Sequence, residues 1–163
     1  MVTLDVAHNM KIEKSIEYLT RELQNALSKE FLNFEQTKQI SDFGIYLIFQ
    51  NEKVIYVGKT NRSGKTRLRE LASDYRSHTL NKKILQILLS KVLKVEFPPL
   101  KKETKRQLID DGILSEEQFK NLQSKVNKLI KSDLRFKFYP TKLDEIIQIE
   151  HFAIAVLNPK MND

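Results

Sequence analysis

Apolar residues recur at intervals of three and four along several stretches of the chain, which is the spacing of one face of an α-helix. Over residues 11–31 this pattern predicts an amphipathic helix whose apolar face consists of Ile12, Ile16, Leu19, Leu23 and Leu27. The same spacing predicts a helix over about 66–75 and a strongly apolar one over about 81–91. In the first of these, Leu68, Leu71 and Tyr75 share a face.

Two more helices are marked by capping signals as well as by periodicity. One begins at Ser115, which with Gln118 three residues later resembles a capping box. The other is expected from Thr141, as its N-cap, to about Leu157, because Asn158 and Pro159 follow and cannot continue a helix.

Short runs of aromatic and β-branched residues predict strands. Residues 43–49 and 53–57 are separated by three polar residues and are expected to form an antiparallel hairpin. With a three-residue loop, Tyr46 faces Tyr56, and both rings share one side of the hairpin with Ile48 and Val54. A slip of one residue in register would separate the two phenols.

Two further strands are predicted over 92–97, at an edge before two prolines, and over 134–139, which ends at Pro140. The pattern as a whole indicates a mixed α/β (α+β) fold with a small central antiparallel sheet flanked by helices. At 163 residues the chain is expected to form one domain, 1–163.

Composition excludes several classes of protein. No apolar run approaches the roughly 20 residues of a membrane span, so no membrane partner is expected. The absence of cysteine excludes disulfides and thiolate zinc sites. The first ten residues lack a signal-peptide pattern, and together these features favour a cytoplasmic protein.

The net charge of +7 is unevenly distributed. Residues 53–106 hold fifteen Lys or Arg and four Asp or Glu, whereas the segments on either side are weakly acidic. A polyanion such as DNA would meet a concentrated positive field there, although a solvated basic surface is the plainer alternative. The candidate DNA contacts are Lys59, Arg62, Lys65, Arg67, Arg69, Arg76, Lys82 and Lys83.

Glu150 is the most informative acidic residue. In the last predicted helix it lies within the apolar stripe and not on the charged face. A carboxylate buried there needs a cation or strong donors, so the alternatives are an ion pair with Arg67, a capping role, or a hard divalent metal ion.

Cations also surround the tyrosine pair. Lys59 and Arg67 follow closely after Tyr56, and cations beside a phenol favour its ionised form, so they are expected to lower its pKa toward that of a general base. The plainer alternative is that Tyr46 and Tyr56 serve only in packing.

The ordered set of these residues resembles the GIY-YIG nuclease superfamily, including the nuclease module of bacterial excision-repair endonucleases and small stand-alone GIY-YIG endonucleases. The matching residues are Gly44-Ile45-Tyr46, Tyr56-Val57-Gly58 with Lys59, Arg67, Glu150 and Asn162. The resemblance covers about residues 42–97 and 141–163. It implies that residues 1–41 are an N-terminal helical extension and that 98–140 is a largely helical insertion within the domain. It departs from the family in Val57, which replaces an isoleucine, and in a loop one residue longer before the arginine, which leaves Arg69 as a rival to Arg67.

The resemblance implies a metal-dependent DNA endonuclease that hydrolyses phosphodiester bonds. Glu150 would bind one Mg²⁺ or Mn²⁺, and Tyr46 would be the general base toward water. Arg67, Tyr56 and Lys59 would orient and stabilise the phosphate, while Asn162 would brace the site. For His78 a surface position is expected, with proton transfer as the alternative.

The rival hypothesis is a catalytically inactive DNA-binding module of the same fold, which uses the basic segment for binding. For either function the expected partner is duplex or branched DNA. Cutting both strands with one small site would call for a homodimer or for successive nicks.

Overall fold

The computed structural model describes residues 2–162, with side chains from His8 onward, and has the expected mixed α/β architecture. Its strands are β1 (Gly44–Gln50), β2 (Lys53–Thr60) and β3 (Arg135–Pro140). Its helices are α1 (Val2–Leu27), the 3-10 helix η1 (Gln36–Gln39), α2 (Gly64–Glu70), α3 (Thr79–Leu93), α4 (Thr104–Asp110), α5 (Glu116–Asp133) and α6 (Ile146–Leu157). In the part of the chain so described, no helix is both long and apolar enough to cross a membrane.

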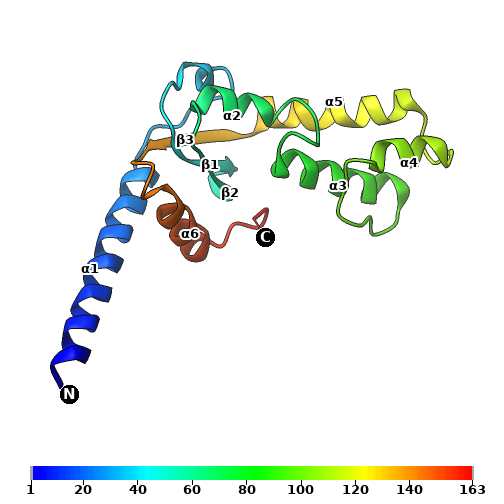
Figure 1. Ribbon diagram of the computed structural model, residues 1–163. Coiled ribbons are helices and arrows are strands. Elements are labelled where there is room, and N and C mark those ends of the chain that lie inside the picture. The colour runs from blue at the N-terminus through cyan, green and yellow to red at the C-terminus, as the bar shows by residue number, and fades with distance from the viewer. Residues whose placement is uncertain (1, 163) are drawn as a thin grey trace.

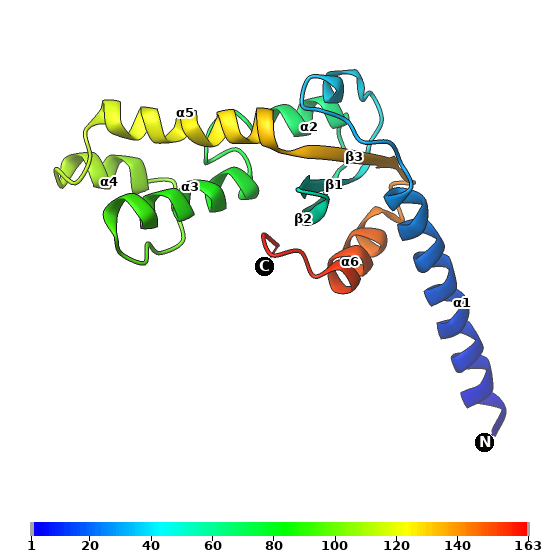
Figure 2. The same cartoon turned by 180° about the vertical axis from the view of Figure 1, so that it is seen from behind.

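The three strands form an antiparallel sheet in the order β2-β1-β3, so β2 and β3 are its two edges. Helices α1 and α6 cover one face, where Leu23, Ala26 and Ile149 pack on Ile45 and Val57. The other face packs against α2 and against a helical arm formed by α3, α4 and α5, which extends to one side of the sheet (Figure 1). The N-terminal part of α1 projects on the opposite side, as the view from behind also shows (Figure 2).

The hairpin differs from the expected register in an informative way. Its loop has two residues, Asn51 and Glu52, both at positive φ, and Gln50 pairs with Lys53. That register alone would turn Tyr46 and Tyr56 to opposite faces, because side chains alternate along a strand. A bulge at Ile55 adds one residue to β2 and restores the parity.

Tyr46 therefore pairs with Gly58 and not with Tyr56, which makes the predicted opposition wrong. The two phenol rings still share a face, as diagonal neighbours, and stack with centroids 6.3 Å apart. The predicted position of Val54 is also wrong, since it packs on the α1 and α6 side, while Ile55 joins the tyrosine side.

The predicted strand over 92–97 is wrong as well. Helix α3 continues to Leu93, and Lys94 ends it in the left-handed conformation. The backbone of Phe97 is then bound by side chains of α3, with its N–H donating to Ser90 Oγ (2.9 Å) and its carbonyl accepting from Gln86 Nε2 (2.8 Å). Because the backbone N–H and carbonyl of Phe97 already have hydrogen-bond partners, they do not need to pair with a β-strand.

The observed helix boundaries agree with the predicted ones where the local sequence signals are strong, and differ from them where those signals are weak. The capping box of Ser115 and Gln118 is formed, and α5 buries its apolar face through Phe119 and Val126. Thr141 does not cap α6: the N-cap position is occupied by Glu145, four residues later, and the helix begins at Ile146. The range 98–140 includes β3, whose Phe136 and Phe138 are buried in the sheet.

Candidate active site

A cavity of about 540 Å³ lies at the β2 edge of the sheet, between the hairpin, α2 and α6. Five of the six predicted catalytic residues line it, together with Arg62: Tyr46, Tyr56, Lys59, Arg67 and Glu150. They come from both faces of the edge strand. Lys59 pairs with Ile45 and points toward α6, whereas the tyrosines point toward α2 and α3.

Gly58 gives the Tyr46 ring its position. The two residues are cross-strand partners, and a Cβ at Gly58 would overlap the Tyr46 ring and its hydroxyl. The missing side chain therefore lets the ring lie flat across β2, with its hydroxyl directed at the cavity rim. This close approach, and not backbone flexibility, explains the glycine of Tyr56-Val57-Gly58.

His78 holds the Tyr46 hydroxyl from the other side. Its Nε2 lies 2.8 Å from Tyr46 Oη, and its Nδ1 accepts the backbone N–H of Leu80 (3.0 Å) at the start of α3. Since Nδ1 is an acceptor, the neutral ring carries its proton on Nε2 and donates it to the phenol oxygen. The Tyr46 hydroxyl proton is then directed elsewhere.

Burial sets the protonation of both groups. Burial, and to a smaller extent the Arg67 charge, together lower the pKa of His78 to about 3, so the ring is neutral at ordinary pH. Burial also raises the pKa of Tyr46, with a further contribution from Tyr56, and the opposing effect of Arg67 is smaller. The expected lowering of the Tyr46 pKa is therefore wrong for the free protein.

Arg67 lies at the cavity and is anchored by Glu70, one turn further along α2. The guanidinium Nη1 donates to Glu70 Oε2 (2.8 Å), and Arg62 donates to both oxygens of the same carboxylate (2.9 Å each). Burial acts to raise the pKa of Glu70, but the two arginines outweigh it and the pKa is lowered. Glu70 thus positions two cations in front of the tyrosines.

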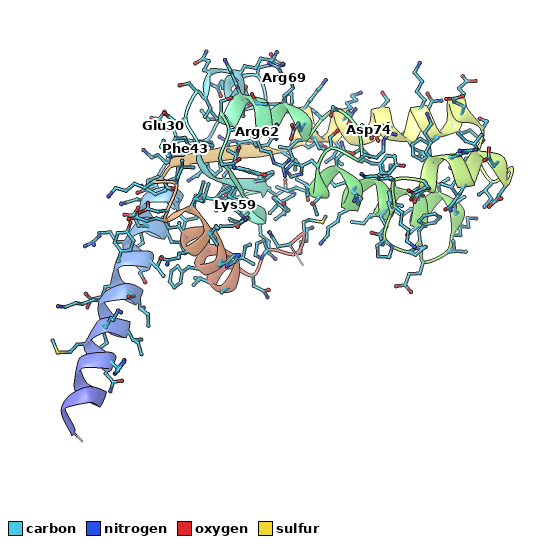
Figure 3. All side chains as sticks on the ribbon, viewed as in Figure 1. Glu30, Phe43, Lys59, Arg62, Arg69 and Asp74 are labelled. Atoms are coloured by element: carbon cyan, nitrogen blue, oxygen red, sulfur yellow. The ribbon has the colours of Figure 1, made fainter. Side chains whose placement is uncertain are left out.

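Of the two candidate arginines, Arg67 and Arg69, only Arg67 lines the cavity. Arg67 lines the cavity, and the following Leu68 is fully buried in the core. Arg69 is exposed and does not line the cavity, and Figure 3 shows it on the outer side of α2, away from Lys59.

Glu150 is only 8% exposed, as its place in the apolar stripe predicted. Its cation is Lys59, whose ammonium group contacts Glu150 Oε2. The alternative of an ion pair with Arg67 is not what forms, since Arg67 is bound to Glu70. Lys59 lies beside α6 in Figure 3.

The donors present define what kind of metal ion the cavity could hold. Glu150 is the one carboxylate among its lining residues. Over the described side chains, no group of three or more His, Asp or Glu converges into a preformed metal site. A single carboxylate fits the Mg²⁺ mode in which water and substrate phosphate supply the remaining ligands.

Asn162 braces the edge strand, as expected, and does so from outside the cavity. Its Oδ1 accepts the N–H of Val57 and its Nδ2 donates to the Val57 carbonyl, both at 2.8 Å. Met161 adds a backbone hydrogen bond to Ile55 (2.9 Å). The tail therefore covers the β2 edge on the loop side of the cavity and leaves open the end that carries Lys59.

The remaining basic candidates are distributed over three surfaces. Lys65 is exposed on α2. Arg76 is bound by Asp74 (2.8 Å). Lys82 and Lys83 lie along α3 in a second and larger hollow.

Sequence reasoning missed His78 and Glu70. His78 was expected at the surface but is only 2% exposed. The available signal was its place two residues before the apolar run that starts at Leu80, where a side-chain acceptor can cap a helix. No family model, no curated protein and no solved structure matches the chain.

Proposed function

We propose that this protein is a GIY-YIG-type, metal-dependent endonuclease that hydrolyses phosphodiester bonds in DNA. The observation that supports the proposal is the convergence of Tyr46, Tyr56, Lys59, Arg67 and Glu150 on one cavity. A buried carboxylate and two fixed cations around a phenol suit charge stabilisation at a phosphate better than they suit packing.

In this mechanism the scissile phosphate lies between Arg67 and Tyr56. Arg67 offers paired donors to the phosphate oxygens, and Glu70 keeps that fork in place. The Tyr46 phenolate takes a proton from water as the water oxygen attacks phosphorus and the bond to the leaving oxygen breaks.

Tyr46 must first lose its own proton to solvent water or hydroxide, which the raised pKa of Tyr46 opposes in the free protein. The Nε2–H of His78 donates to the phenol oxygen and would stabilise the phenolate once it forms. Arg67 acts in the same direction, because its charge and hydrogen bonding lower the pKa of Tyr46. His78 is therefore a positioning donor and not a proton carrier.

Glu150 would hold the divalent ion, which when bound supplies positive charge to the phosphate and the leaving oxygen. In the absence of such an ion Lys59 neutralises Glu150. With the ion held by Glu150, the Lys59 ammonium group would be available to the phosphate. The ion pair would then serve to keep the buried carboxylate neutralised between turnovers.

The test is nicking of supercoiled plasmid with Mg²⁺ or Mn²⁺, against chelator. Tyr46→Phe is expected to lower the rate by about 100-fold or more while DNA binding changes little. Tyr139→Phe is the matched control, since Tyr139 lies on the α1 side of the sheet and bonds Glu22. Arg67→Ala should lower the rate by about 100-fold or more, and Arg69→Ala should not.

The rival, an inactive DNA-binding module, gives a different result. It predicts that the parent protein binds DNA but does not nick it with either metal ion, and that Glu150→Gln binds equally well. Nicking that persists in Glu150→Gln, or in chelator, would contradict the metal-dependent mechanism.

A further inference from the structure

A second hollow, of about 1090 Å³, runs along α3. One wall is a single helix face, because the α3 residues that line it are spaced by three and four from Thr79 to Lys91, a pattern that Lys94 extends past the end of the helix. The opposite wall is the segment 95–100, with Lys160 and Met161 from the C-terminal tail. A helix of this length gives the hollow a reach of about 20 Å.

The hollow is strongly basic. Five lysines line it against one acid, Glu96, and they come from α3, its end and the tail. Among the described side chains, none of Lys82, Lys91, Lys94 and Lys160 takes part in an ion pair. Cations left without acidic partners along one path are complementary to a polyanion.

The lining between the lysines is apolar. Ile87 is 40% exposed and Val95 is 56% exposed, with Phe97 and Pro99 beside them. A double helix presents phosphates on its outside and keeps its base faces stacked within, so its bases cannot pack on the apolar lining of the hollow. An unpaired base has a free face that packs on such a surface.

The wall of the hollow is preformed. Gln86 and Ser90 of α3 hold the backbone of Phe97 from both sides, at 2.8 and 2.9 Å, in the segment that was expected to be a strand. A ligand therefore meets an ordered groove and does not have to order the loop, which lowers the cost of binding.

The hollow also adjoins the candidate active site through the chain itself. Thr79 lines the hollow, and the preceding His78 contacts Tyr46. At the other wall Met161 lines it, and the following Asn162 braces β2. The same two short segments thus line the hollow and contact the strands that carry the candidate active site.

We infer that the α3 hollow binds single-stranded DNA, the unpaired segment next to the phosphate that is cut. The inference rests on the proposed function in taking DNA as the polyanion. It makes a junction between duplex and single strand the preferred substrate, because the duplex stays outside the hollow while one unpaired strand follows α3.

The test measures binding of a fluorescent 12-nucleotide oligothymidylate by anisotropy, in chelator so that nothing is cut. Lys91→Ala/Lys94→Ala is compared with Lys125→Ala/Lys128→Ala, which removes two exposed lysines of α5 outside the hollow. We expect the first pair to weaken binding at least about fivefold and to make the slope of log K against log salt shallower by about 1.4. The α5 pair should change neither quantity appreciably.

The apolar lining is tested separately. Ile87→Ser is expected to weaken oligothymidylate binding by about threefold or more, while Ile113→Ser, at a residue that is also exposed but lies outside the hollow, should not. Binding of a blunt duplex should change less than twofold in both variants.

Equal losses in the two lysine pairs, or equal losses for duplex and single strand, would overturn the inference. A parent protein that nicks plasmid while the α3 variants bind oligothymidylate normally would overturn it and leave the nuclease intact. Binding that depends on Lys91 and Lys94 in a protein that never nicks would support the hollow and reject the nuclease.

Discussion

At the scale of residues, the chemistry of the cavity depends on which groups are charged. Tyr46 and His78 are both buried and both are held neutral, and the hydrogen bond between them runs from Nε2 to the phenol oxygen. Two cations are fixed by Glu70, and a third, Lys59, is held at Glu150. The site therefore places three cations around an uncharged phenol.

Mutation can separate the roles of the two His78 nitrogens, which are the hydrogen bond to Tyr46 and the cap of α3. His78→Asn retains a side-chain acceptor for Leu80 N–H but loses the donor to Tyr46. We expect its melting temperature to stay close to that of the parent and its nicking rate to fall about 10- to 100-fold. His78→Gln can still donate to Tyr46 and lacks the cap, so it should lose about 1 kcal/mol of stability and less of the rate. The reverse order of rates would contradict the donor role.

The raised pKa of Tyr46 predicts the pH dependence of cleavage. Below its pKa the phenolate fraction increases tenfold per pH unit, so the single-turnover rate should increase by up to about tenfold per unit between pH 7 and 9. His78, with a pKa of about 3, should add no second step in this range. A rate that is flat above pH 7 would remove Tyr46 from the role of base.

At the scale of elements, the hairpin brings the two phenols together through a compensation. The two-residue turn changes the parity of β2, and the bulge at Ile55 changes it back. Gly58 then accommodates the ring that this register places across it. The two-residue turn, the bulge and Gly58 together orient Tyr46 and Tyr56 toward the same side of the hairpin.

Gly58→Ala should displace Tyr46, because the added methyl group overlaps the ring. We expect a loss of about 1–3 kcal/mol of stability, with nicking reduced as strongly as in Tyr46→Phe. In a Tyr46→Leu background the same alanine should cost clearly less. A double-mutant cycle by denaturant unfolding measures this coupling, and additive effects would contradict the contact.

At the scale of the whole molecule, the sheet and the helical arm share one core. The buried cluster that begins with Tyr46 and Tyr56 continues through Leu71 and Tyr75 into Leu89 of α3 and Val126 of α5. An amide network of Asn81, Gln123 and Asn127 ties the end of α2 to the arm at 2.6–3.1 Å. The arm is thus packed as part of the domain.

This shared core predicts one unfolding transition. Far-UV circular dichroism reports mainly on the helices, whereas the near-UV signal comes from the 14 Phe and Tyr residues, six of which lie in the strands. The two signals should nevertheless give the same midpoint. Leu89→Ala, in the arm, should lower that midpoint at both wavelengths through a loss of about 2–5 kcal/mol. Two separate transitions, with only one shifted, would show that the arm folds independently.

The sequence by itself determined the elements whose signals are local: the capping box of α5, the apolar face of α3, the alternation of β3, and the position of Glu150 in an apolar stripe. It also selected five residues that line one cavity. Periodicity and capping act between neighbours in the chain, so they can be read without knowing what packs against them.

Tertiary structure decided the rest. Contacts between distant segments determine the ion-pair partner of Glu150, the burial of His78, the bulge at Ile55 and the hydrogen bond from α3 to the Phe97 backbone. The protonation of Tyr46 likewise follows from desolvation, which nearby cations in the sequence do not reveal. Burial and long-range hydrogen bonds are properties of the folded chain, and a one-dimensional pattern does not contain them.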